Sequence, residues 1–430
     1  MPDATTTFVI RVAGAGLALA QQLLLARLMT GPDYGAYVIA LAWIAALGSP
    51  VSLGLAEAAV RILPRYAARG RITRLEAFFA SGWRMAATTG AMSAIGGGAL
   101  LALLPFGAMG LHTGIIVLAG LPLIAIDYFL DGVARGMGWF RLGTLNYFVL
   151  RPLLVAAACL LLHVSGEGLT LASAGAATIL SMAATTGALL LVFRRRLSTG
   201  RPERAGPRLA RLWLRSAIPM LVVTGLDGLM PAAALLAVGL LLGPAEAGLY
   251  GTAERLLSLA SFAQFAVLFV SARLMSLSLV GAGAESPERS LQRATAGTLL
   301  ATGGALAATL ALAPHLLTLF GPEFGEAHQA MFILALALLA RAVAAPCHEF
   351  LLLAGQNRAL GLINGATLFL LAGLMTLLSP LCGLTGAAVA AACSMAVRSA
   401  LLLRQARVSM GLSALPALRP RASGPANSAV

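Results

Sequence analysis

The segment GPDYGAY at residues 31–37 recurs as GPAEAGLY at residues 243–250, and this repeat guides the interpretation of the whole chain. Each copy follows a long apolar segment and contains Gly-Pro, an acidic residue and then Gly-x-Tyr, with one residue inserted in the second copy. A Gly-Pro pair ends a helix and turns the chain. A shorter pattern, Leu-Gly-x-x-Asn, also occurs twice, at residues 142–146 and 360–364. The sequence therefore predicts two similar halves.

The residues around these turns are too apolar for a soluble protein. Of the 430 residues, 59% are hydrophobic and only 11% are charged, whereas about a quarter of a soluble chain is charged. A membrane-spanning helix needs about 20 mostly apolar residues. The predicted spans are residues 8–29, 34–56, 85–104, 114–134, 142–163, 169–193, 217–242, 248–271, 294–313, 329–353, 360–379 and 386–404. Six spans in each half give the two halves the same orientation, as in parallel repeats.

The positive charge is sorted along the chain. All thirty basic residues are Arg, and 24 of them lie in segments that follow even-numbered spans, while segments after odd-numbered spans have none. Cytoplasmic loops of membrane proteins collect Lys and Arg. This sorting predicts a multi-pass inner-membrane protein with both termini in the cytoplasm. It also explains the net charge of +14 without nucleic-acid binding.

The longest basic segment lies near the middle of the chain and contains Arg201-Pro202 and Gly206-Pro207, which are typical of a linker. The end of the chain is rich in Pro and Ser, as disordered segments are. The predicted organisation is a first six-helix bundle (1–193), a cytoplasmic basic linker (194–216), a second six-helix bundle (217–404) and a disordered cytoplasmic tail (405–430).

Several segments resemble a known family. Residues 24–37, 248–256, 319–324, 354–357 and 383–388 resemble motifs of Wzx-like polysaccharide-repeat flippases of the multidrug/oligosaccharidyl-lipid/polysaccharide exporter superfamily. The resemblance covers roughly residues 8–404. It implies an all-α fold in which two six-helix bundles form a V around a central cavity. It also implies flipping of an undecaprenyl-pyrophosphate-linked sugar repeat from the cytoplasmic to the periplasmic leaflet by alternating access, with the polysaccharide polymerase machinery as a further partner. The alternative is a drug or cation exporter of the same superfamily.

Arginines inside the spans are candidates for binding an anionic cargo. Arg is always charged and offers a bidentate fork to phosphate, and charged groups within spans seldom face lipid. The candidates are Arg151, Arg255 and Arg341, with Arg27 as a further one. The alternative is a structural ion pair with a carboxylate or a helix end. Arg27, Arg11 and Arg398 lie near span ends, from which their guanidinium groups can reach the interface.

Carboxylates inside the spans are candidates for coupling or gating, either as a proton or Na⁺ site or as counter-ions of the arginines. They are Asp127, Asp131, Asp227, Glu254 and Glu349. A catalytic acid pair at Asp127 and Asp131 is the enzyme interpretation, which the short outer segments disfavour. The four cysteines form no C-x-x-C pair and the histidines show no metal-ligand spacing, so no metal is expected. Gly96-Gly97-Gly98 lacks the Lys and Ser or Thr of a P-loop, so no nucleotide cofactor is expected.

Overall fold

A computed structural model describes residues 2–103, 110–166, 168–197, 207–279 and 285–414. All secondary structure within these ranges is helical. The elements are α1 (Pro2–Leu28), α2 (Gly31–Val51), α3 (Leu55–Ala68), α4 (Ile72–Leu103), α5 (Leu111–Gly136), α6 (Phe140–Leu145), η1 (Asn146–Leu150), α7 (Arg151–Val164), α8 (Leu171–Leu197), α9 (Pro207–Leu241), α10 (Pro244–Leu279), α11 (Pro287–Phe320), η2 (Pro322–Ala327), α12 (His328–Leu353) and α13 (Asn357–Met410).

The predicted all-α membrane fold is confirmed. Within the described ranges, nine helical segments are long and apolar enough to cross a membrane. One of them combines α6, η1 and α7 into a single span, Phe140–Val164. Another, α13, contains two spans, since the backbone breaks at Gly383 with φ 60° and ψ −140°. A further apolar helix, Gly228–Leu241, lies within α9. With α13 counted as two spans, these helices account for eleven of the twelve predicted spans, and the remaining one, 85–104, falls on α4 up to Leu103. Large apolar side chains such as Ile95, Leu300 and Phe369 are exposed on the outside.

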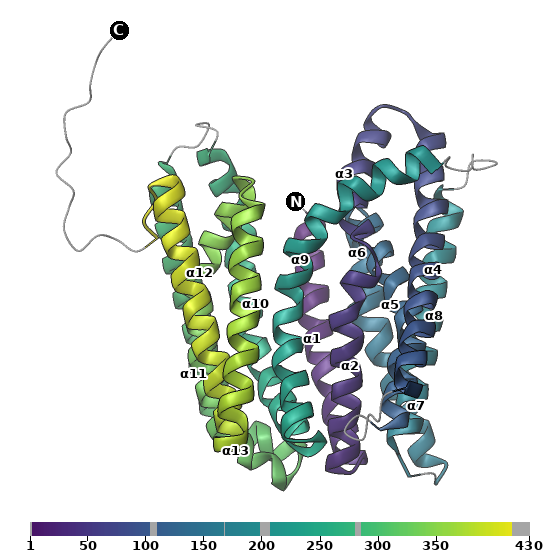
Figure 1. Cartoon of the computed structure of the whole chain (residues 1–430), viewed down its shortest axis with the longest axis vertical. Coiled ribbons are helices and arrows are strands. Elements are labelled where there is room, and N and C mark those ends of the chain that lie inside the picture. Colours follow the sequence, from purple (N-terminus) through teal and green to yellow (C-terminus); the bar gives the residue numbers. More distant parts are fainter. Residues whose placement is uncertain (1, 104–109, 167, 198–206, 280–284, 415–430) are drawn as a thin grey trace, which may run out of the picture.

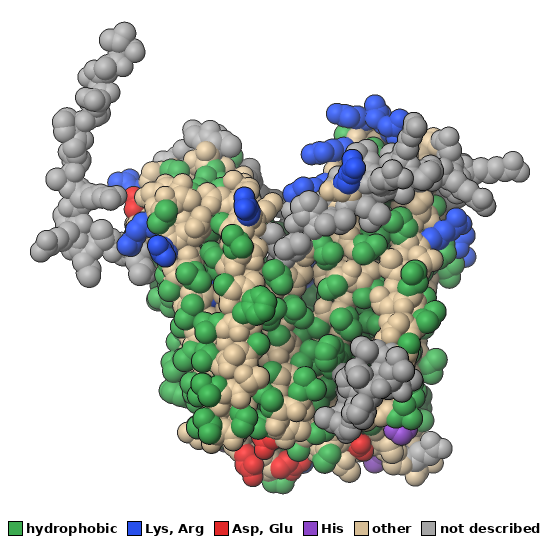
Figure 2. Space-filling view, viewed as in Figure 1, with side chains coloured by type: hydrophobic (Ala, Val, Ile, Leu, Met, Phe, Trp, Pro, Cys, Tyr) green, Lys and Arg blue, Asp and Glu red, His purple; other side chains and the backbone are tan. Residues whose placement is uncertain are grey.

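The two halves form a V (Figure 1). Helices α10–α13 make one arm and α1–α8 the other, and α9 lies between them against α2 and α13. Figure 2 shows the Arg side chains of this face at one end of the molecule, and its His and most of its Asp and Glu side chains at the other. The basic end exposes Arg61, Arg65 and Arg194, and the acidic end exposes Glu323 and Glu326. The surface is hollowed between the arms at the basic end, which the Arg sorting predicts to be cytoplasmic.

The arms meet at the acidic end. The phenol of Tyr34 in α2 lies 3.4 Å from the hydroxyl of Thr252 in α10, and its ring packs edge-on against Phe324 in η2. The guanidinium of Arg27, in the last turn of α1, donates to the carbonyls of Thr318 and Leu319 at the end of α11. Helices leave their last carbonyls without partners, so Arg27 joins the halves by capping α11.

The predicted second span, 34–56, is wrong at its end. Helix α2 stops at Val51, and the chain turns through Leu53 (φ 53°) and Gly54 (φ 67°) into a separate amphipathic helix, α3. Leu55 and Leu63 of α3 are fully buried, while its basic side chains are exposed. The apolar run that suggested a longer span is therefore the buried face of α3, which packs on α5 and α9.

The ends of three other helices also differ from the predicted spans. Helix α8 continues to Leu197, α9 begins at Pro207, and α13 continues to Met410, beyond the predicted end at residue 404. The centre of the predicted linker (198–206) and most of the predicted tail (415–430) lie outside the described residues.

Candidate functional site

A central cavity lies between the two arms. It consists of three adjoining pockets of about 510, 430 and 340 Å³ that share Ser258 of α10 among their lining residues. The first is lined by α1, η1, α9, α10, α12 and α13, the second extends between α2, α9, α10, α12 and α13, and the third reaches into the first half between α1, α2, α5, α7 and α8. The cavity is therefore built from both halves, and a relative movement of the halves changes its shape.

Three arginines line the first pocket. Nη2 of Arg341 donates to the hydroxyl of Ser261 at 3.0 Å, and Nε of Arg398 donates to the side-chain oxygen of Asn364 at 3.0 Å. The guanidinium of Arg11 lies over the rings of Phe265 and Phe148, 4.9 and 5.7 Å from their centroids. His348 and Glu349 of α12 line the same pocket. The aromatic contacts place Arg11 where its charge faces the cavity rather than lipid.

Glu254 and Arg255 line the second pocket together with Arg341. Both come from α10, just after the second copy of the repeated segment. Arg255 also lines the third pocket. Its guanidinium makes no hydrogen bond or ion pair with another described residue. Arg255 therefore presents its guanidinium donors at the junction of two pockets, with the carboxyl of Glu254 as its electrostatic neighbour.

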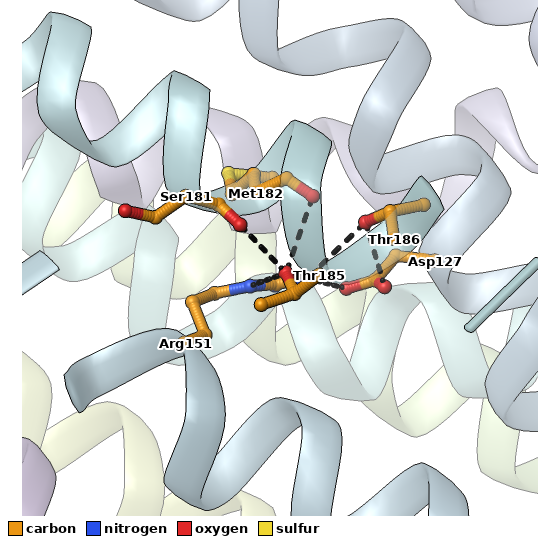
Figure 3. Close-up of polar contacts among 6 residues, drawn as sticks. All are labelled: Asp127, Arg151, Ser181, Met182, Thr185 and Thr186. Atoms are coloured by element: carbon orange, nitrogen blue, oxygen red, sulfur yellow. Dashed lines mark hydrogen bonds and ion pairs between the residues drawn. The ribbon is translucent and has the colours of Figure 1, made fainter. Parts of the chain in front are cut away.

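Arg151 lines the third pocket and is paired (Figure 3). Its Nη2 lies 2.6 Å from Oδ2 of Asp127 on α5. The hydroxyl of Thr186 donates to the other carboxylate oxygen at 3.1 Å, and the hydroxyls of Thr185 and Thr186 lie 3.4–3.5 Å from the guanidinium. The side chains of Arg151 and Asp127 are 12% and 7% exposed. The two interpretations of Arg151, cavity residue and ion-pair partner, therefore both apply.

The other candidates are dispersed. Arg27 lies at the acidic end, outside the three pockets, where it caps α11. Asp131 pairs with Arg135 at 2.8 Å, and Arg135 also contacts Glu57 at 3.4 Å. These three side chains line a separate pocket of about 220 Å³ between α2, α3, α5 and α9. Asp227 belongs to α9, but its side chain lies outside the described residues. In the described part of the chain, no three His, Cys, Asp or Glu side chains gather as a metal site.

Two cavity arginines, Arg11 and Arg398, were assigned to span ends by the sequence. The structure places both in the first pocket because α1 begins at Pro2 and α13 ends at Met410, so neither residue is at a helix end. The sequence could have identified Arg11 and Arg398 as cavity residues only by showing that their helices extend beyond the apolar segments. With them, the cavity wall holds five arginines and two glutamates, Glu254 and Glu349.

No protein-family model and no curated protein matches this sequence. Solved structures match it over nearly its whole length. The chain is similar to a multidrug resistance MATE family transporter of the MOP superfamily in an inward-facing conformation, with a TM-score of 0.72, 15% identity and 94% of each chain covered. The outward-facing conformation of such a transporter gives a TM-score of 0.65 at 16% identity, covering 94% of this chain and 95% of the other.

The fold is that of the MATE transporters. A third similar structure is a MOP superfamily transporter from Pyrococcus furiosus. Its binding pocket is described as having reverse polarity, which suggests a different function for that protein. It gives a TM-score of 0.55 at 15% identity and covers 94% of this chain and 95% of its own. At these identities the likeness concerns the fold, so the substrate has to be inferred from the cavity of this chain.

Proposed function

We propose that this protein is a transporter that moves an anionic, amphipathic substrate across the membrane by alternating access of its two halves. The observation that carries the proposal is the set of five arginines on a cavity shared by both halves and open at one end. Charged side chains within the membrane are costly, and the five arginines outnumber the neighbouring carboxylates of Asp127, Glu254 and Glu349, so an anionic ligand would compensate the excess positive charge. The likeness to inward- and outward-facing MATE structures supports the movement.

The cavity fits a substrate with two different parts. Arg255 and Arg341 offer planar donor groups that match phosphate or carboxylate oxygens. Phe148, Phe262 and Phe265 line the first pocket together with Arg341 and offer apolar surface. An anionic head group can therefore be held by the arginines while an apolar part contacts the phenyl rings.

Two classes of amphipathic anion satisfy this description. A lipid-linked pyrophosphate sugar, the cargo of the polysaccharide flippases, would keep its lipid tail in the bilayer while its head group crosses the cavity. A smaller anionic drug-like compound would be exported whole. The solved neighbours give more support to an exporter, since they are described as multidrug resistance transporters. The positive cavity favours an anion over the cations expected of the exporter alternative.

Reconstitution in proteoliposomes tests the proposal. We expect the protein to move a fluorescent anionic amphiphile and not its cationic analogue. Arg341→Gln removes the charge and should abolish most transport, whereas Arg341→Lys keeps the charge without the fork and should retain part of it. Arg194→Gln, at the exposed basic end, is the matched control and should transport normally. Transport of the cationic analogue alone would replace the proposal by cation export.

Gene deletion separates the two anion classes. If the cargo is a lipid-linked sugar, deletion should leave that precursor on the cytoplasmic leaflet, and Arg341→Lys should restore export better than Arg341→Gln. If deletion leaves the surface polysaccharide and its precursor unchanged but raises sensitivity to toxic anions, the protein is an exporter of small compounds. Raised sensitivity to cationic dyes instead would support the cation exporter.

A further inference from the structure

The Arg151–Asp127 pair is held by only part of the guanidinium. All contacts between the two side chains go through Nη2, and Nε reaches only the hydroxyl of Thr185. Nη1 makes no hydrogen bond to a described residue. A guanidinium has five N–H donors in a fork that can bind a carboxylate bidentately. The pair is therefore monodentate, and one edge of the fork remains available in the third pocket.

A substrate anion can reach that edge. Arg151 and Arg255 line the same pocket, and Arg255 and Arg341 line the next one. The three guanidinium groups therefore follow one continuous space from the second half into the first. Arg255 makes no salt bridge with a described residue, although the carboxyl of Glu254 interacts with it electrostatically, while Arg151 is paired with Asp127. An anion can therefore bind the donor groups of Arg255 without displacing a salt-bridge partner, whereas at Arg151 it competes with Asp127.

The backbone beside Arg151 has an unusual form that permits movement. Residues 146–150 form a π-helical segment, and the amide N–H of Arg151 donates to the carbonyl of Asn146, five residues earlier. The next residue, Pro152, has no N–H to hold the following turn. Single-turn π segments are frequent at functional sites. Returning this turn to α geometry shifts the register by one residue, which rotates Arg151 by about 100° around the helix axis.

We propose that Arg151 is an exchangeable counter-ion, which a substrate anion takes from Asp127 as it enters the third pocket. The inference rests on the proposed function and specifies how the first half senses the substrate. In this structure, Asp127 neutralises Arg151. Removing one partner of a buried ion pair is strongly unfavourable, so the pair opens only when another anion binds the guanidinium. Asp127 then keeps the Thr186 hydroxyl as its hydrogen-bond donor.

Binding of inorganic pyrophosphate to the full chain in lipid nanodiscs tests the exchange. Asp127→Asn keeps the shape of the side chain and removes the competing charge. Because charge-assisted hydrogen bonds are among the strongest, this variant should bind pyrophosphate about tenfold more tightly than the unaltered chain. Glu57→Gln is the matched control, since Glu57 contacts Arg135 outside the central cavity, and its affinity should be unchanged.

A double variant keeps the result specific to Arg151. In Asp127→Asn with Arg151→Lys, which has the same net charge as Asp127→Asn but lacks the guanidinium fork, the gain in affinity should be smaller, whereas a general change in cavity charge would leave the gain in place. Should Asp127→Asn lose its cooperative unfolding transition, Asp127→Ser serves in its place. If the unaltered chain binds pyrophosphate but Asp127→Asn binds it equally or less tightly, the exchange is wrong and the anion-transport proposal stands. If the unaltered chain binds no pyrophosphate, both the exchange and the anion-transport proposal are wrong.

Discussion

Gly35 of α2 lies so close to Pro244 of α10 that a side-chain Cβ on Gly35 would overlap the carbonyl oxygen of Pro244. A Cβ on Gly248 would in turn come within 3.3 Å of the Gly35 Cα atom. These glycines belong to the two copies of the repeated Gly-Pro segment. The two copies therefore contact each other directly, and their glycines allow the helices from the two halves to close the acidic end of the cavity.

Gly35→Ala should open that closure. The added methyl group cannot fit against the Pro244 backbone, so α2 and α10 must separate, and the state that is open at the acidic end gains population. Spin labels at Thr170 and Glu326, which are exposed on the two arms at that end, should move further apart in a chain without its four native cysteines. Gly31→Ala is the control, since a Cβ there meets no atom within 4 Å. An unchanged label distance in Gly35→Ala would contradict this account of the closure.

Cysteines in place of Arg255 and Arg341 should react with a water-soluble thiol reagent mainly from the basic side of the membrane. Both positions line the cavity, which is hollowed toward the basic end and closed at the acidic end. The measurement is labelling in everted and right-side-out vesicles. Arg27→Cys is the comparison and should react from the acidic side, because Arg27 is exposed there. Protection of both cavity positions from either side would indicate closed ion pairs instead.

The element types and the two-fold repeat could be predicted because each follows from local sequence. Apolar length gives the spans, and Gly31-Pro32 and Gly243-Pro244 give the turns. The candidate arginines could be identified in part for the same reason, since an Arg in the middle of an apolar span is unusual. Arg151, Arg255 and Arg341 line the cavity whereas Arg27 does not, and a role in substrate binding stays a prediction.

The rest depends on helix ends and on helix packing, which a single sequence does not specify. Arg11 and Arg398 were placed at the interface because the apolar segments end near them, although the helices continue. The partner of Arg151 is Asp127 rather than any of the other span carboxylates, and that choice is made by how α5, α7 and α8 pack. Likewise, α3 could not be separated from α2 because a turn at Leu53 has no strong sequence signal.

The orientation of the membrane protein remains a prediction from the Arg sorting. Reporter fusions at Gly200 and after Arg407 should show activity of a cytoplasmic reporter, because both lie in segments rich in Arg. A fusion at Gly168, between the fifth and sixth spans, should show activity only with a periplasmic reporter. Periplasmic activity at Gly200 would reverse the topology, and the cavity would then open outward in this structure.

Gly132→Ala should destabilise the protein by detaching α3. A Cβ on Gly132 of α5 would overlap the backbone of Ala56 in α3, which is 4% exposed. Overpacking of this kind typically costs about 1–3 kcal/mol, so the thermal unfolding midpoint in detergent should fall. Gly187→Ala in α8 is the matched control, because a Cβ there meets no atom within 4 Å. Helix α3 also contacts α9, the helix between the arms, so its detachment should lower transport more than the loss of folded protein explains. Equal midpoints for the two variants would mean that α3 does not pack on α5 as described.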